Sequence, residues 1–383
     1  MDGIEGHVGE AQGGPAPLSG GRQASPRVLI CIPTLGSGGA ERQVRLLGRR
    51  LVARGIPLSL FSRMGEVDIR DMEAGGVRCF PIRAPGNHNP LMAIELWRAL
   101  RTSRAAIVHS FLPQMDIVAG GWALLAGKLW LLSERSSPLA YCGGLKNAVR
   151  ARLGRHAAAI VANSAAGLAV WPDARLHPVI PNGLDLTAID AAPSDREGER
   201  AVLAGRTVIL SVARLAPEKK LDQLIEATAL LSDRLPGLLT VLIGAGPEAD
   251  ALRALADRRG IGGHVHFAGY RADVWSWMKQ ASVFVGPSLF EGHPNAVLEA
   301  AAAGIPQILT DIPMHRDAVG DGGALFVPVG DAGALADAIL VQIEGHERAA
   351  DMAAAARAHV EPLSIERAAD RFAALYRQLA KPV

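Results

Sequence analysis

The 383-residue sequence has little cysteine and few aromatic residues. Its 3 cysteines are an odd number, lie far apart and form no Cys-x-x-Cys pair, which argues against a disulfide framework or a cysteine-rich zinc site and fits a reducing cytosol. Aromatic residues make up 4% of the chain, too few for the stacking platforms that bind single-stranded nucleic acid, so we expect no nucleic-acid partner. The longest apolar run, residues 117–126, is too short to span a bilayer.

The beginning of the chain lacks the apolar segment of a secretory signal. Residues 1–26 are rich in Gly, Pro and Ser and contain no long apolar run. We interpret them as a disordered tail, and we expect a cytoplasmic protein.

The net charge of +2 conceals an uneven distribution. Residues 27–163 carry 19 Lys and Arg against 8 Asp and Glu, whereas residues 164–383 carry 20 against 27. A basic half beside an acidic half suggests that the first half faces an anionic partner, such as phosphates or a membrane surface.

Short apolar runs alternate with helical stretches along the chain, in two series. The runs that predict strands are residues 28–32, 58–61, 105–108, 129–132, 159–162 and 179–180 in the first series, and 208–212, 239–243, 264–268, 282–285, 307–310 and 324–327 in the second. This alternation predicts an α/β protein with two facing Rossmann-like domains, each a doubly wound parallel sheet. We assign residues 27–190 to the N-terminal, acceptor-side domain and residues 200–363 to the C-terminal, nucleotide-sugar domain.

Two glycine-rich segments follow predicted strands, at the sheet edge where such domains bind ligands. One contains Gly38 and Gly39, and the other contains Gly244. Glycine lets a phosphate approach the backbone, and the free N–H groups of the following helix attract an anion. A turn without a ligand explains the same glycines, and neither segment is a G-x-G-x-x-G fingerprint or a Walker P-loop.

The helix predicted after the first glycine-rich segment is amphipathic. Val44, Leu47 and Leu51 share one face, and five arginines lie opposite, at positions 42, 45, 49, 50 and 54. A basic amphipathic helix binds anionic lipid in some proteins, and a solvated face is the simpler alternative.

Three ionisable side chains also follow predicted strands. His109 comes directly after the run 105–108, where an imidazole contacts substrate, acts as a general base, or simply makes structural hydrogen bonds. Arg214 and Lys219 follow a strand end and are five residues apart. Such a pair can clamp a diphosphate and stabilise a departing nucleotide, although an ordinary basic loop has the same appearance.

The most specific segment is residues 290–300, Phe-Glu-Gly-His-Pro-Asn-Ala-Val-Leu-Glu-Ala. Pro294 and Asn295 favour a helix start, which leaves Glu291 in the preceding loop and Glu299 about one turn into the helix. Two carboxylates therefore flank a helix N-terminus. Free N–H groups there bind phosphate oxygens, and carboxylates accept hydrogen bonds from sugar hydroxyls, so a nucleotide sugar fits this site.

Taken in order, these motifs resemble the retaining glycosyltransferases of family 4, which have the GT-B fold. The resemblance spans about residues 27–365. The residues that carry it are Gly-Gly-Ala-Glu at 38–41, His109, Ile-Pro-Asn-Gly at 180–183, Arg214, Lys219, and the glutamates Glu291 and Glu299 separated by seven residues.

The resemblance implies a role for each candidate residue. Arg214 and Lys219 would bind the donor diphosphate, Glu291 the transferred sugar and Glu299 the ribose. His109 would lie beside the donor sugar, which completes the catalytic set His109, Arg214, Lys219 and Glu291. The backbone amides of Gly38, Gly39, Asn295, Ala296 and Val297 would bind the phosphates. Backbone groups near Tyr270 and Arg271 would bind the base. Gly244 and Glu299 complete the expected donor-binding set.

The resemblance further implies a helix within residues 364–383 that crosses back to the N-terminal domain. Two positions depart from the usual pattern: Lys220 replaces a glycine or asparagine, and His293-Pro294-Asn295 replaces Phe-Gly-Leu. The second variant is associated with enzymes that build surface polysaccharides or lipid-linked glycans. Because the chain has no Asp-x-Asp, we expect transfer without a metal ion or other cofactor.

The expected activity is transfer of a hexose or N-acetylhexosamine from a nucleotide-diphosphate sugar, with UDP as the expected nucleotide, to a hydroxyl of a glycan or lipid-linked acceptor. Alternatives are a nucleotide-sugar epimerase of the same fold and a non-catalytic nucleotide-sugar-binding protein. An oxidoreductase ranks last, because no dinucleotide fingerprint is present. Peripheral contact with the inner face of the cytoplasmic membrane is a further hypothesis, suggested by the basic first half.

Overall fold

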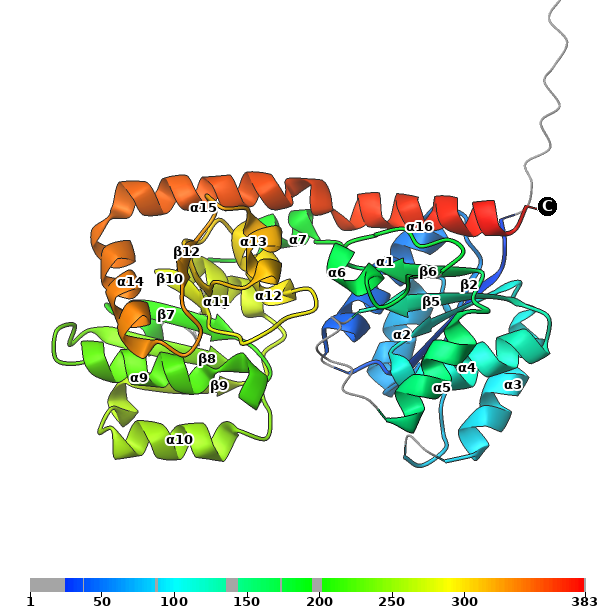
Figure 1. Cartoon of the computed structure of the whole chain (residues 1–383), viewed down its shortest axis with the longest axis horizontal. Coiled ribbons are helices and arrows are strands. Elements are labelled where there is room, and N and C mark those ends of the chain that lie inside the picture. Colours follow the sequence, from blue (N-terminus) through cyan, green and yellow to red (C-terminus); the bar gives the residue numbers. More distant parts are fainter. Residues whose placement is uncertain are drawn as a thin grey trace, which may run out of the picture.

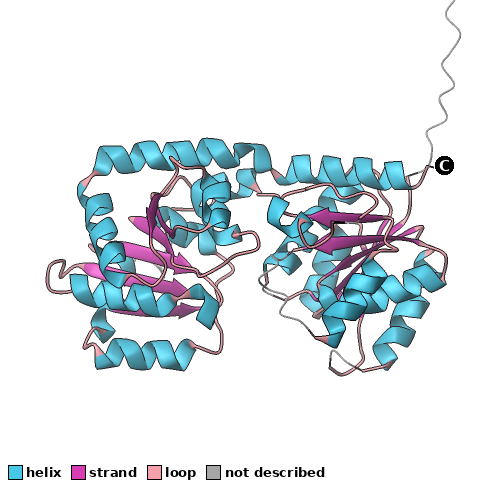
Figure 2. Ribbon diagram, viewed as in Figure 1, coloured by secondary structure: helices cyan, strands magenta, loops and turns pink. Residues whose placement is uncertain are grey.

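The computed structural model describes residues 25–36, 38–86, 89–135, 144–172, 174–194 and 202–381. All but the last two residues of the expected N-terminal tail lie outside these ranges. The described chain forms two domains, each a sheet with helices packed against it, and they stand side by side (Figures 1 and 2).

The N-terminal domain contains a six-stranded parallel sheet with the order β3-β2-β1-β4-β5-β6. Its strands are β1 (Val28–Thr34), β2 (Leu58–Arg63), β3 (Arg78–Pro81), β4 (Ile107–Phe111), β5 (Leu129–Glu134) and β6 (Ala159–Ala162). Its helices are α1 (Gly39–Ala53), α2 (Glu66–Ala74), α3 (Leu91–Ser103), α4 (Pro113–Leu125), α5 (Leu145–Gly154) and α6 (Ala165–Leu168).

The C-terminal domain repeats this architecture with the strand order β12-β11-β10-β7-β8-β9. Its strands are β7 (Thr207–Val212), β8 (Leu238–Ile243), β9 (Val265–Gly269), β10 (Val283–Gly286), β11 (Gln307–Thr310) and β12 (Leu325–Val327). Its helices are α9 (Leu221–Leu231), α10 (Ala249–Arg258), α11 (Val274–Gln280), α12 (Asn295–Ala302), α13 (Pro313–Val319), α14 (Ala332–Glu344) and α15 (His346–Val360), and α7 (Leu186–Ala191) leads into it.

The predicted α/β class and the two parallel sheets are confirmed by this topology. The central strands are buried on both faces, which explains their nearly continuous apolar sequences. In each sheet, strands are added first on one side of the first strand and then on its other side. The change of side falls between β1 and β4 in the N-terminal sheet and between β7 and β10 in the C-terminal sheet. A doubly wound sheet binds ligands at this switch point, outside the carboxyl ends of the strands.

Two expectations about strands were wrong. β3 was not predicted, because Arg-Cys-Phe-Pro contains no apolar run; it is a partly exposed edge strand. Residues 179–180 form no strand beyond a single bridge between Val179 and Ala162. Pro178 and Pro181 flank this pair and lack the N–H groups that would extend the ladder.

The two connections between the domains pair with each other. Leu184, on the way to the C-terminal domain, exchanges backbone hydrogen bonds of 2.8 Å with Leu363 and Ile365, on the way back. Gln43 of α1 fixes this crossing, since its amide group bonds both the N–H and the carbonyl of Gly183, at 2.8 and 2.9 Å.

Helix α16 (Ile365–Leu379) returns to the N-terminal domain after this crossing. In Figure 1 it continues the line of α15 and lies over the N-terminal domain beside α1. Its apolar face, which includes Phe372 and Tyr376, is buried in the N-terminal core. Among the described residues, none of the helices combines the length and the hydrophobicity that crossing a bilayer requires.

The hydroxyl of Tyr376 lies 2.7 Å from Nδ1 of the buried His109, and this contact anchors α16. We expect Tyr376→Phe to lower the free energy of unfolding by about 1–3 kcal/mol, because it leaves a buried imidazole nitrogen without a partner. Thermal unfolding should show this as a fall of several degrees in Tm. Tyr270→Phe removes a hydroxyl from an exposed tyrosine and serves as the control. Equal midpoints for the two variants would show that the contact contributes little.

Candidate active site

The N-terminus of α12 lies against the N-terminal domain. We call the region around this contact, between the carboxyl ends of the two sheets, the crevice. Asn295, its first residue, accepts a hydrogen bond of 2.7 Å from the side-chain amide of Asn182. A Cβ atom at position 39 would lie 2.3 Å from Asn295 Nδ2, so any other residue at this position would displace the Asn295 side chain. The structure therefore brings the first glycine-rich segment against the predicted phosphate-binding helix end, with the backbones of Ala296 and Val297 just inside that helix.

Lys219 and Glu291 form an ion pair in the same crevice. The Lys219 ammonium lies 2.5 Å from Glu291 Oε1, and the Ser288 hydroxyl donates to the same oxygen at 2.7 Å. Both side chains are less than one-fifth exposed, at 19% and 15%. The loops after β7 and β10 thus hold a cation and a carboxylate together at the switch point of the C-terminal sheet.

Arg214 follows β7 as predicted, but it takes no part in the ion pair between Lys219 and Glu291. Its side chain is 65% exposed and forms an ion pair with Glu218. Arg214 lies on the same loop as Lys219, between β7 and α9.

Glu299 is buried on α12 and joins the two domains. Its Oε2 accepts hydrogen bonds from Arg42 of α1 at 3.0 Å and from the Trp275 indole at 3.2 Å. The Arg42 guanidinium also stacks over the Trp275 ring, 4.7 Å from its centroid. Burial raises the pKa of Glu299, and the charge of Arg42 opposes this rise.

The remaining donor-binding candidates lie at the ends of β8 and β9. The Gly244 N–H donates to the Gly269 carbonyl at 2.8 Å, which places the two strand ends side by side. Gly244 has a φ of 145°, and a Cβ there would lie 1.8 Å from the Ala213 carbonyl oxygen. Tyr270 is exposed, and Arg271 forms a bidentate ion pair with Asp273 at 3.0 Å.

The expected position of His109 was wrong. It lies inside β4 and not after it, because Ser110 and Phe111 continue the ladder with β5. The ring is fully buried, with Nδ1 against the Tyr376 hydroxyl and Nε2 against the Ser133 hydroxyl, each at 2.7 Å. Burial, aided by the charge of Arg135, lowers its pKa well below 6.5 and keeps it neutral. Its contacts are those of a structural histidine.

The arginine face of α1 was also misinterpreted. All five arginines form ion pairs, with Glu299, Asp68, Asp71, Asp185, Glu366 and Asp370 as the partners. Three of them, Arg42, Arg50 and Arg54, bind residues far away in the sequence, on α12, on the domain crossing and on α16. The face is therefore used for packing within the molecule, and the lipid hypothesis loses its basis on this helix.

Sequence reasoning missed two residues that the structure places in the crevice. Arg42 was considered only as part of the basic helix face, and nothing in its local pattern indicates a carboxylate 257 positions away. Arg135 follows β5 directly and was overlooked, although the rule that drew attention to other strand ends applies to it equally.

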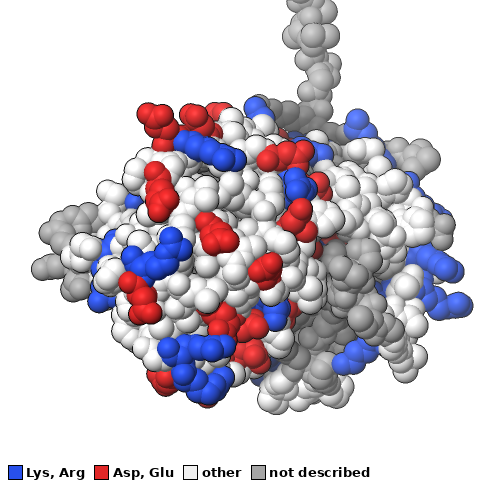
Figure 3. All heavy atoms as spheres, turned by 60° about the vertical axis from the view of Figure 1, so that its left-hand side comes forward, with Lys and Arg blue, Asp and Glu red and all other residues white. Residues whose placement is uncertain are grey.

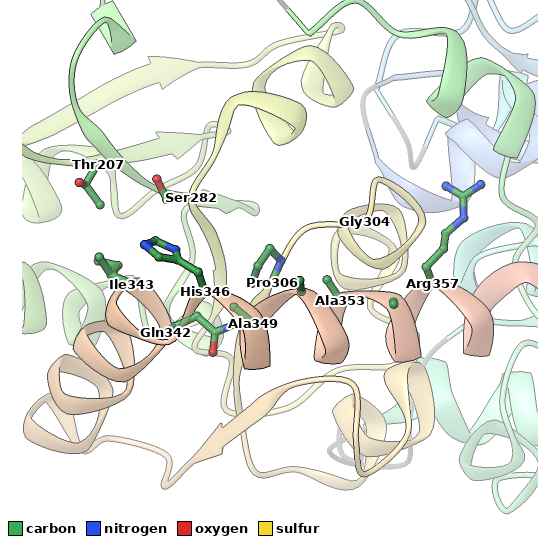
Figure 4. Close-up of a pocket in the computed structure, with 12 residues that line it drawn as sticks. Thr207, Ser282, Gly304, Pro306, Gln342, Ile343, His346, Ala349, Ala353 and Arg357 are labelled. Carbon is green, nitrogen blue, oxygen red and sulfur yellow. The ribbon is translucent and has the colours of Figure 1, made fainter.

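A separate groove of about 610 Å³ lies on the C-terminal domain (Figure 4). Thr207, Ser282 and Pro306 line it at the amino ends of β7, β10 and β11, and α15 forms its other wall. It is at the opposite sheet edge from Lys219 and Glu291, so we assign the candidate active site to the crevice.

Comparison with known proteins agrees with this arrangement. The family model of glycosyltransferase family 4 matches residues 37–188, and that of glycosyl transferases group 1 matches residues 196–359. The lipopolysaccharide core biosynthesis glycosyltransferase LpsE of Rhizobium meliloti is 28% identical over 304 residues, which cover 79% of this chain and 84% of LpsE. The putative glycosyltransferase EpsD of Bacillus subtilis is 36% identical over 130 residues, only 34% of each chain.

Solved structures show the same fold. Anabaena Alr3699/HepE in complex with UDP-glucose has a TM-score of 0.79 at 19% identity, covering 92% of this chain and all of that one. WaaG, a glycosyltransferase involved in lipopolysaccharide biosynthesis, has a TM-score of 0.71 at 17% identity, covering 91% and 99%. The two matched family models together span most of both domains, and the chain therefore belongs to the family 4 glycosyltransferases with the GT-B fold.

Proposed function

We propose that the protein transfers a hexose or N-acetylhexosamine from a UDP-sugar to a hydroxyl of a glycan or lipid-linked acceptor, with retention of the anomeric configuration and without a metal ion. The observation that carries this proposal is the crevice where Lys219, Glu291 and the N-terminus of α12 converge from the C-terminal sheet. The HepE complexes with UDP and UDP-glucose support the choice of nucleotide, and the relative LpsE supports a role in polysaccharide or lipopolysaccharide synthesis.

The proposed chemistry needs stabilisation of the leaving diphosphate above all. The bond between the anomeric carbon and the phosphate oxygen breaks, and its electron pair stays on that oxygen. Lys219, Arg214 and the free N–H groups of α12 would bear this negative charge, since preorganised donors are worth most where charge develops. The anomeric carbon then forms a bond to the acceptor oxygen on the face that the phosphate leaves, and the leaving phosphate takes the proton of the acceptor hydroxyl.

We place the proposed membrane contact on helices α3, α4 and α5, which lie side by side on the N-terminal domain (Figure 1). They expose five large apolar side chains: Leu91, Ile94, Leu125, Leu145 and Val149. On the same helices, or within three residues of their C-terminal ends, are seven basic residues without ion pairs to described residues: Arg98, Arg101, Arg104, Lys128, Lys146, Arg152 and Arg155. We call this set the α3–α5 surface.

The α3–α5 surface has the charge pattern of a lipid-binding face. The acidic residues of these helices are Glu95, which bonds backbone N–H groups, and the buried Asp116. Figure 3 shows acidic and basic side chains intermingled over the C-terminal domain, whereas those at the right-hand edge, on the N-terminal domain, are mostly basic. Exposed apolar side chains among unpaired cations suit an anionic bilayer, where each basic residue adds about 1 kcal/mol of attraction.

The proposed reaction can be tested with purified protein. A thermal-shift screen against UDP-, GDP- and ADP-sugars should show the largest stabilisation with a UDP-sugar, because a ligand of the native state raises Tm by mass action. With that donor and a glycan acceptor, NMR of the product should show retained configuration, equally with and without EDTA. A new sugar nucleotide formed from the donor alone would instead identify an epimerase, and loss of activity in EDTA would contradict transfer without a metal.

Lys219→Ala and Arg214→Ala should lower kcat, the first by about 10²–10³-fold, because each removes a charge from the leaving diphosphate. Lys220→Ala is the matched control, since this neighbouring lysine pairs with Asp222 and is expected to keep near-normal turnover. Near-normal kcat for both Lys219→Ala and Arg214→Ala would leave the mechanism without support.

Flotation with vesicles tests the α3–α5 surface. The wild-type protein should float with phosphatidylglycerol vesicles at low salt, and less at high salt because surface charges are screened. The double variant Lys146→Glu, Arg152→Glu should lose most of this binding, more than tenfold. The control double variant Arg234→Glu, Arg258→Glu makes the same change of charge at exposed positions of the C-terminal domain. This control should bind the vesicles as well as the wild-type protein does. Equal losses in both variants would contradict a specific surface.

A further inference from the structure

A partly buried cation of the N-terminal domain lies near the N-terminus of α12. Arg135 directly follows β5, at the carboxyl end of the sheet. Its guanidinium stacks over the ring of Phe111, 5.0 Å from the centroid, and lies 6.0 Å from that of Phe372. These two rings fix the plane of the guanidinium and hold it in place.

None of the hydrogen bonds of Arg135 to the described residues goes to a carboxylate. Nη1 donates to Asn182 at 2.6 Å and Nη2 to the Ser133 hydroxyl at 3.2 Å, while Nε is buried and has no partner among the described residues. The adjacent carboxylate, Glu134, is engaged by Arg150 at 2.8 Å and by the Trp171 indole at 2.9 Å. Burial lowers the pKa of Arg135 to about 10, so the side chain still carries its charge at neutral pH.

His293 lies in the same part of the crevice and also has an unused nitrogen. Its Nε2 is buried and has no partner among the described residues. Burial, together with the positive charge of Arg135, lowers the pKa of His293 to about 4, which keeps the ring neutral. Two buried polar nitrogens, one from each domain, therefore have no hydrogen-bond partner among the described residues.

A chain of hydrogen bonds connects Arg135 to the predicted phosphate site. Asn182 accepts from Arg135 and donates to Asn295, the first residue of the eight-residue helix α12. The free N–H groups and partial positive charge at a helix N-terminus attract phosphate. A partly buried cation that makes no hydrogen bond to a carboxylate of the described residues is stabilised by binding an anion.

We propose that Arg135 binds the β-phosphate of the donor, so that both domains contribute a cation to the leaving group, and that His293 contacts a hydroxyl of the transferred sugar next to it. This inference rests on the proposed function. When the bond to the anomeric carbon breaks, the electron pair remains on the phosphate oxygen, and Arg135 stays protonated and stabilises the new charge. A nucleoside diphosphate engages it, whereas a nucleoside monophosphate does not reach it.

Calorimetric titration of the full chain with UDP and with UMP tests the proposal. Arg135→Gln should weaken UDP binding by roughly tenfold to a hundredfold, the value of a charged hydrogen bond, and UMP binding by less than about threefold. Arg135→Lys keeps the charge but not the fork of donors, so its affinity for UDP should lie between those of the wild type and Arg135→Gln. This variant also provides the test if Arg135→Gln does not fold. Arg371→Gln, on the outer face of α16, is the control.

The outcomes separate this inference from the proposal on which it rests. Unchanged UDP binding in the Arg135 variants, or equal weakening of UDP and UMP, would overturn it, because an arginine that merely holds the domains together affects both nucleotides alike. Absence of binding of UDP, GDP and ADP to the wild-type protein would overturn the proposed function itself, and this inference with it.

Discussion

The buried carboxylate of Glu299 is the constraint on which the geometry of the crevice depends. A desolvated carboxylate needs a positive partner, and Arg42 supplies it from the opposite domain. Both side-chain hydrogen bonds go to Oε2, so Oε1 keeps its acceptor capacity. A ribose hydroxyl can therefore donate to Glu299 without breaking the contact between the domains. This ion pair holds α12 of the C-terminal domain against α1 of the N-terminal domain.

A second set of contacts couples the C-terminal helix to the same crevice. The Tyr376 hydroxyl bonds His109, His109 bonds Ser133, and Ser133 accepts from Arg135. With the tyrosine donating to Nδ1, the neutral imidazole carries its proton on Nε2 and donates to Ser133. These hydrogen bonds connect α16 to the Arg135 guanidinium. The helix that returns from the other domain also helps to build the site.

The sequence predicts the local features of this enzyme better than its long-range contacts. The helix start at Asn295 and the place of Glu299 one turn later follow from Pro294 and the residues around it, because capping is a local property. The arginines of α1 show the opposite case. Periodicity places them on one face, but it does not reveal that α12 and α16 cover that face. His109 was misplaced for a similar reason, since the ladder with β5 sets the length of β4.

The pairing of Lys219 with Glu291 has a consequence for the proposed transfer. The carboxylate holds the ammonium in place before any phosphate is present, so little reorganisation is needed when the donor binds. A diphosphate that takes over the lysine leaves Glu291 with its Ser288 hydrogen bond and one free oxygen, ready to accept from a sugar hydroxyl. Lys219 would thereby bind the leaving diphosphate, and Glu291 would bind the sugar on the other side of the bond that breaks. Arg135 differs, because none of its hydrogen bonds to the described residues goes to a carboxylate, which leaves its guanidinium suited to the proposed phosphate.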